Sequence, residues 1–120
     1  MDKKYEYPEI ERRQDILTLA IRQCSEGVAM ANLEGDLVYV NEAFAEMHGY
    51  ASEDILGKNL TIFHTSEQMS SVDAANRQIK EKGYFKGEVW HKRADGSVFP
   101  TIMNNSLIKN DNGEYTFWNL

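Results

Sequence analysis

The chain has 120 residues, which suits one domain with a modest hydrophobic core. Its 42% apolar and 27% charged residues are typical of a water-soluble domain, and no apolar run is long enough to span a bilayer. The net charge of −6 argues against nucleic-acid binding, which requires a basic surface. We therefore expect a cytoplasmic domain without nucleic-acid or membrane contact, and a parent protein that is still free to be membrane-anchored.

The first predicted element is an amphipathic helix over residues 9–26. Pro8 suits a first helical turn, and Gly27 is a typical residue just past a helix end. The single cysteine, Cys24, has no partner for an internal disulfide, which fits a reducing compartment. We interpret residues 1–26 as a flanking and dimerisation helix and residues 27–120 as the domain. One stripe of the helix is apolar: Ile10, Leu17, Ala20, Ile21 and Cys24.

A hairpin and a helix follow. Residues 28–33 and 37–40 are predicted as strands around the turn at 34–36. Asn41 is a good N-cap for a helix that runs to His48.

The next segment is predicted to be helical and the last one to be strands. A short helical turn capped by Ser52 is expected at 52–56, and another short turn at 60–63. A longer helix is expected at 66–82. The remaining strands are predicted at 84–93, 98–108 and 114–120. The class is α+β, because the helices must cover the apolar face of an antiparallel sheet.

Three stretches of the sequence together resemble the PAS family of sensor domains, of the S-box type. Residues 34–41 read Glu-Gly-Asp-Leu-Val-Tyr-Val-Asn, and residues 49–57 read Gly-Tyr-Ala-Ser-Glu-Asp-Ile-Leu-Gly. Residues 85–99 contain Phe-Lys-Gly-Glu and Lys-Arg-Ala-Asp-Gly-Ser-Val-Phe, which is similar to the PAC motif of that family. The resemblance runs from about residue 25 to 120. It implies a five-stranded antiparallel sheet in the order 2-1-5-4-3, with helices on one face and a ligand cavity between them.

The cofactors of this family each need their own residues. LOV-type flavin domains need a cysteine after the short turns, and residues 57–63 contain none. Haem-binding members commonly use a histidine on the longer helix, which has none here; His48 and His64 are the alternative ligands. We therefore expect neither haem nor LOV-type flavin, and no metal, since no two histidines have metal-ligand spacing. Binding of a redox-active flavin without a cysteine is left as an alternative, although Phe85 occupies a position where redox flavin domains of this family often carry tryptophan.

Strand alternation and helical spacing predict which side chains line the cavity. Such a lining suits a small amphipathic ligand. The alternative is a core that is simply filled. By resemblance, His91 and Asn119 occupy positions that contact flavin in LOV domains. The predicted ligand-binding residues are Met30, Phe44, Met47, Ile55, Phe63, Ile79, Phe85, His91, Thr101, Met103, Asn105 and Asn119.

The resemblance implies a sensory input domain of a signal-transduction protein, such as a histidine kinase of a two-component system or a diguanylate cyclase. A ligand in the core would signal through the flanking helices and homodimer contacts to a downstream effector domain. A ligand-free dimerisation or interaction module is the alternative. A stand-alone enzyme is the third hypothesis, and only the polar set His91, Thr101, Asn105 and Asn119 favours it. Since no nucleophile elbow or phosphate loop occurs, we expect no enzyme activity in the chain itself.

The face of the sheet away from the helices is expected to be apolar. We predict that Trp90, Tyr39 and Trp118 lie there. Such a face requires a cover, either the 9–26 helix or a second copy of the chain.

Overall fold

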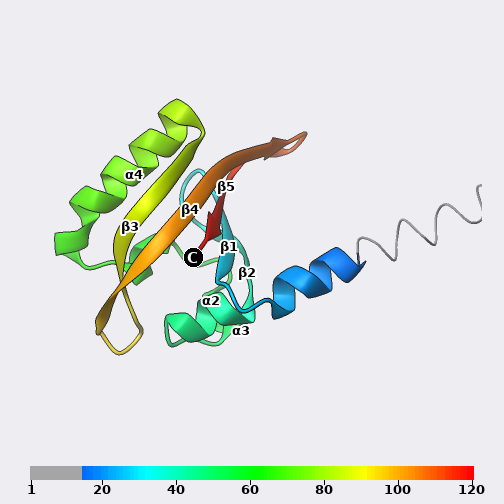
Figure 1. Cartoon of the computed structure of the whole chain (residues 1–120), viewed down its shortest axis with the longest axis horizontal. Coiled ribbons are helices and arrows are strands. Elements are labelled where there is room, and N and C mark those ends of the chain that lie inside the picture. Colours follow the sequence, from blue (N-terminus) through cyan, green and yellow to red (C-terminus); the bar gives the residue numbers. More distant parts are fainter. Residues whose placement is uncertain (1–14) are drawn as a thin grey trace, which may run out of the picture.

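The computed structural model describes residues 15–120 (Figure 1). Five strands form one antiparallel sheet in the order β2-β1-β5-β4-β3, as the family resemblance implied. The strands are β1 (Val28–Asn32), β2 (Leu37–Val40), β3 (Tyr84–Lys92), β4 (Val98–Asn110) and β5 (Gly113–Asn119).

The helices lie between β2 and β3 in the chain and on one face of the sheet. They are α2 (Glu42–Met47), α3 (Ser52–Ile55), the 3-10 turns η1 (Leu60–Phe63) and η2 (Ser66–Gln68), and α4 (Met69–Lys82). Figure 1 shows α4 running alongside β3, with α2 and α3 below β1 and β2. No helix within residues 15–120 is long and apolar enough to cross a membrane.

An N-terminal helical segment over residues 15–23 projects away from the sheet (Figure 1). Residues 9–14 of the predicted helix lie outside the described residues. The helical segment ends at residue 23, three residues earlier than predicted, and the chain then turns towards β1.

The side chain of Asn41 joins this N-terminal segment to β1 and α2. Its Oδ1 accepts hydrogen bonds from the backbone N–H of Phe44 (2.9 Å) and Val28 (3.0 Å). Its Nδ2 donates to the carbonyls of Ile21 and Glu26, both at 2.9 Å. Asn41 is therefore the predicted N-cap of α2 and also an anchor for the chain that precedes β1.

Local chemistry explains where the remaining helices begin and end. Thr65 and Gln68 form a reciprocal capping box, so the helix predicted from residue 66 opens with the 3-10 turn η2. Gly83 ends α4 with φ of 84°, a left-handed conformation that favours glycine. Ser52, predicted as a cap, is the first residue of α3, and Ala51 precedes it without a side-chain hydrogen bond.

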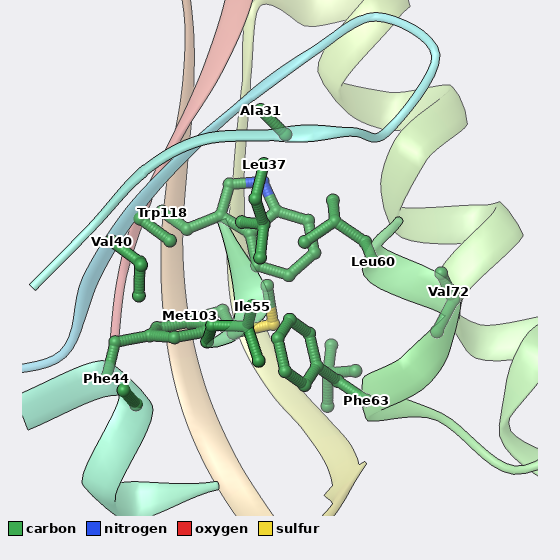
Figure 2. Close-up of a cluster of buried hydrophobic side chains, with 13 residues drawn as sticks. Ala31, Leu37, Val40, Phe44, Ile55, Leu60, Phe63, Val72, Met103 and Trp118 are labelled. Atoms are coloured by element: carbon green, nitrogen blue, oxygen red, sulfur yellow. The ribbon is translucent and has the colours of Figure 1, made fainter. Parts of the chain in front are cut away.

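The hydrophobic core fills the space between the sheet and the helices (Figure 2). Phe44, Ile55 and Phe63 are fully buried and come from α2, α3 and η1. Figure 2 shows the Trp118 indole beside Leu37 and Leu60. A row of side chains on the covered face of the sheet supplies the other wall: Phe85, Asn105, Trp118, Ala29 and Val40 lie opposite one another on successive strands.

The register corrects three predictions about the faces of the sheet. Trp118 was predicted on the outer face, but it pairs with Ala29 and is only 3% exposed, in the core. Met30 and Asn119 were predicted to point inward. Met30 follows Ala29 and Asn119 follows Trp118, so both side chains lie on the opposite face of the sheet. The sequence pattern failed here because β1 and β5 are central strands, in which alternation of apolar and polar residues is weak.

Candidate functional site

All three histidines of the chain come together beneath the helices. His48 Nε2 lies 2.8 Å from His91 Nδ1, and the ring of His64 meets the ring of His91 edge-on with centroids 4.8 Å apart. Each of the three is at most 5% exposed. His48 follows α2, His64 follows η1 and His91 lies on β3, so the folded sheet brings together residues that are far apart in sequence.

The hydrogen bonds of this cluster fix where its protons lie. His48 Nδ1 is 2.7 Å from the Phe44 carbonyl oxygen, which can only accept, so this nitrogen carries the hydrogen. In neutral His48 the other nitrogen, Nε2, is then an acceptor, and His91 Nδ1 donates to it. His91 Nε2 is left with a lone pair, and it lies 3.2 Å from Met103 Sδ.

The cluster is uncharged at neutral pH. Burial is the main cause: it lowers the pKa of His48 and His64 from 6.5 to about 4 and the pKa of His91 to about 2. The neighbouring positive groups Arg93 and Lys92 lower the pKa of His48 and His64 further.

A cavity of about 170 Å³ opens between α4, η1 and the β1–β2 turn. An inner space of about 10 Å³, enough for one water molecule, lies deeper against the sheet. His64, Val72, Asn76 and Trp118 border both spaces. Met103 and Asn105 border only the inner one, so they form its deep end.

Two polar groups at the inner space are unsatisfied. Asn105 Oδ1 and both ring nitrogens of His64 have no hydrogen-bond partner within residues 15–120, although all three atoms are buried. The Trp90 carbonyl and the Gln68 side chain are close enough to His64 to raise its pKa, but neither meets it in hydrogen-bonding geometry. A buried polar group without a partner costs about 1–3 kcal/mol, so these atoms are suited to a bound molecule.

The rim of the cavity is held by Asn59, the N-cap of η1. Its Nδ2 donates to the Glu34 carbonyl at 2.9 Å and to Asp36 Oδ1 at 3.0 Å, which ties η1 to the β1–β2 turn. Gly35 in that turn has φ of 88°, and a Cβ there would lie 3.2 Å from Asn59 Nδ2. The left-handed backbone and the close contact both favour glycine at this position.

The predicted ligand-binding residues fall into different places. Ile79 lines the cavity, and Met103 and Asn105 border the inner space. His91 joins the histidine cluster, and the Thr101 hydroxyl is satisfied by the Val89 carbonyl at 2.6 Å. The other inward residues belong to the packed core or its edge: Phe44, Met47, Ile55, Phe63 and Phe85.

The sequence did not indicate His64, Asn76 or Trp118 as lining residues. Asn76 was detectable, because it follows Val72 by four residues on α4 and so shares its face. Among residues 15–120, no group of three His, Cys, Asp or Glu side chains is arranged to hold a metal ion.

Comparison with known proteins gives a consistent family. A family model described as a PAS domain matches residues 25–120. The human voltage-gated delayed rectifier potassium channel KCNH8 is 28% identical over 83 residues, 65% of this chain and only 7% of the channel. A PAS domain from a two-component sensor histidine kinase superimposes with a TM-score of 0.78 at 16% identity, over 91% of this chain and 95% of that one. An RNA-binding light-oxygen-voltage receptor superimposes with a TM-score of 0.70 at 25% identity, over 89% of this chain and 32% of that one.

Proposed function

Because the chain belongs to the PAS domain family, whose domains are sensory modules, we propose that it is the input domain of a signalling protein and binds a small molecule in its cavity. The observation that supports ligand binding is the position of the unsatisfied polar atoms of His64 and Asn105 at the inner end of the cavity. We further propose that the parent protein carries an effector domain, such as a histidine kinase or a diguanylate cyclase.

The cavity favours a small, uncharged, amphipathic ligand. Its volume of about 170 Å³ is below the range of about 300–1,000 Å³ that is usual for drug-sized ligands. Leu60, Val72 and Ile79 offer apolar walls, while Asn105 Oδ1, which borders the adjoining inner space, lacks a hydrogen-bond donor among the described residues. A charged organic group at the inner end would lie beside the neutral His64 and would form neither an ion pair nor a metal–ligand bond there, which burial penalises.

Asn41 provides a route by which occupancy could change the flanking helix. A ligand signals only if it binds one of two arrangements more tightly. If it shifts the helices that cover the cavity, α2 moves with them, and the Asn41 amide transfers that shift to the carbonyls of Ile21 and Glu26.

Native mass spectrometry of the gently purified protein, incubated with a metabolite extract, tests ligand binding. We expect a bound mass that disappears in Val72→Phe, because the larger side chain fills the cavity. Val38→Phe, on an exposed position of β2, is the matched control and should retain the bound mass. Absence of any bound mass, together with an unchanged melting temperature in the extract, would count against a ligand-binding domain.

A second proposed function, homodimerisation, is favoured by the exposed apolar surface. The N-terminal helix exposes Ile16 and Leu17 by 62% and 63%, and the outer face of the sheet exposes Trp90 and Ile102 by 45% and 58%. Surfaces of this kind are usually covered by a partner, and a second copy gives a two-fold symmetric arrangement. Light scattering should report a dimer that Leu17→Glu converts to a monomer, with the exposed Gln23→Glu as control. A dimer unaffected by Leu17→Glu would exclude the helix as the interface.

A further inference from the structure

The lone pair of His91 Nε2 has no donor to accept from. It lies 3.2 Å from Met103 Sδ, which in a thioether carries no hydrogen either. If His91 instead carried its hydrogen on Nε2, His48 Nε2 would have to donate to His91 Nδ1. A neutral His48 would then have a lone pair on Nδ1, only 2.7 Å from the Phe44 carbonyl oxygen. In the neutral cluster, two buried electron-pair donors therefore face each other, and a cation bound to both would remove the mismatch.

The separation of these two atoms suits a shared metal ion. Bonds of about 2.0 Å to an imidazole nitrogen and about 2.3 Å to a sulfur are typical of protein metal sites. Atoms 3.2 Å apart then subtend an angle of about 95° at the metal, so neither side chain has to move far to bind it. His64, whose ring nitrogens are both unpartnered within residues 15–120, meets the His91 ring edge-on with centroids 4.8 Å apart, which makes it the candidate for a third nitrogen ligand.

The chemistry of these ligands selects a soft monovalent ion. The candidate ligands are neutral, and no carboxylate or thiolate of the described residues joins them. The nearby Arg93 and Lys92 add positive charge, which disfavours a divalent ion. Thioether and imidazole ligands together favour Cu(I) over harder ions such as Mg²⁺ or Ca²⁺.

The surroundings of the site support the same reading. The His91 Nδ1–H donates to His48, which in turn donates to the Phe44 carbonyl, and such a chain orients a metal-binding imidazole and fixes its tautomer. His64 and Met103 border the inner space, and His64 also borders the outer cavity, so two of the three candidate ligands lie beside these spaces.

We propose that His91 Nε2 and Met103 Sδ, with His64 as a third ligand, form a Cu(I) site at the inner end of the cavity. No electron transfer is implied, since the ion binds and leaves as Cu(I). The site does not require the organic ligand proposed above, so each can fail without the other.

Anaerobic titration with Cu(I) against the competing chromophore bicinchoninate tests the site. The full chain with Cys24→Ser is the reference protein, because a free thiol would bind Cu(I) by itself. We expect one equivalent of Cu(I) per chain and at least tenfold weaker binding after Met103→Leu, a substitution of nearly equal volume. Met30→Leu removes a thioether from the opposite face and should leave the affinity unchanged. Equal affinity of the Met103→Leu and reference proteins would overturn the proposal, as would a failure to compete with bicinchoninate.

A second measurement needs no substitution of a proposed ligand. Methionine methyl groups labelled with ¹³C can be followed by NMR while Ag(I), a redox-inert substitute for Cu(I), is added to the same Cys24→Ser protein. The Met103 methyl signal should shift and saturate at one equivalent, while the Met30 signal stays in place. A shift of Met30, or no shift of Met103, would refute the site.

Discussion

Lowering the pH from 7 to 5 should remove about 5–6 kcal/mol from the free energy of unfolding, because of the three buried histidines. Each has a pKa of about 4 or lower in the folded protein and 6.5 in the unfolded chain. The unfolded chain therefore takes up protons first as the pH falls. The stability that these residues provide is complete above about pH 6.5 and decreases towards pH 4.

The size of the effect follows from the same pKa values. At pH 5 each unfolded histidine is almost fully protonated while its folded form stays neutral, which costs about 1.9 kcal/mol relative to pH 7. Three such residues give the total, and about two thirds of it falls between pH 6 and pH 5. Since small domains are stable by about 5–15 kcal/mol, the protein should be close to acid unfolding at pH 5.

Urea unfolding at pH 7, 6 and 5, followed by the fluorescence of the buried Trp118, measures this loss. His64→Gln is the best control, because this ring makes no hydrogen bond within residues 15–120. It should retain about two thirds of the pH dependence. A loss below about 2 kcal/mol in the original protein, the contribution of a single histidine, would refute the conclusion that all three are buried and neutral.

Three substitutions test other parts of the structure by the same urea assay. Asn41→Ala should cost about 3 kcal/mol, because it removes the α2 cap and leaves the Val28 N–H without its partner; a cost below about 1 kcal/mol would contradict the network. Phe44→Ala should cost about 3–5 kcal/mol, since this fully buried ring stacks on His48 and meets Phe63 edge-on, and a small loss would indicate a loosely packed core. Gly83→Ala should cost only about 1 kcal/mol, because its φ of 84° is strained for alanine while no described atom lies within 4 Å of the added Cβ; a larger cost would indicate a hidden contact.

Local signals in the sequence predicted most of the fold. The helix capped by Asn41, the end of α4 at Gly83 and the β3–β4 hairpin are set by short-range chemistry, and the structure confirms them. The alternation within β3 also correctly placed Phe85 and His91 on the covered face. Such signals work because each depends on a few neighbouring residues.

The candidate site was harder to predict, because long-range contacts create it. His48 and His91 are 43 positions apart, and no spacing rule connects them. The inward position of Trp118 depends on the register of β5 against β1, which the sequence of β5 does not reveal because Phe117 and Trp118 are adjacent and both aromatic. The inner space lies between α4 and residues of β3, β4 and β5, which are far apart in the sequence.

The hydrogen bonds of Asn41 also determine how short a self-sufficient fragment of this protein can be. The predicted boundary between residues 26 and 27 would cut away the Ile21 and Glu26 carbonyls. A fragment that starts at Gly27 would bury an amide group without these acceptors, at a cost of about 1–3 kcal/mol. Any expression fragment, or any fusion protein that uses this domain, should therefore begin upstream of Ile21, so that it includes the last turn of the flanking helix.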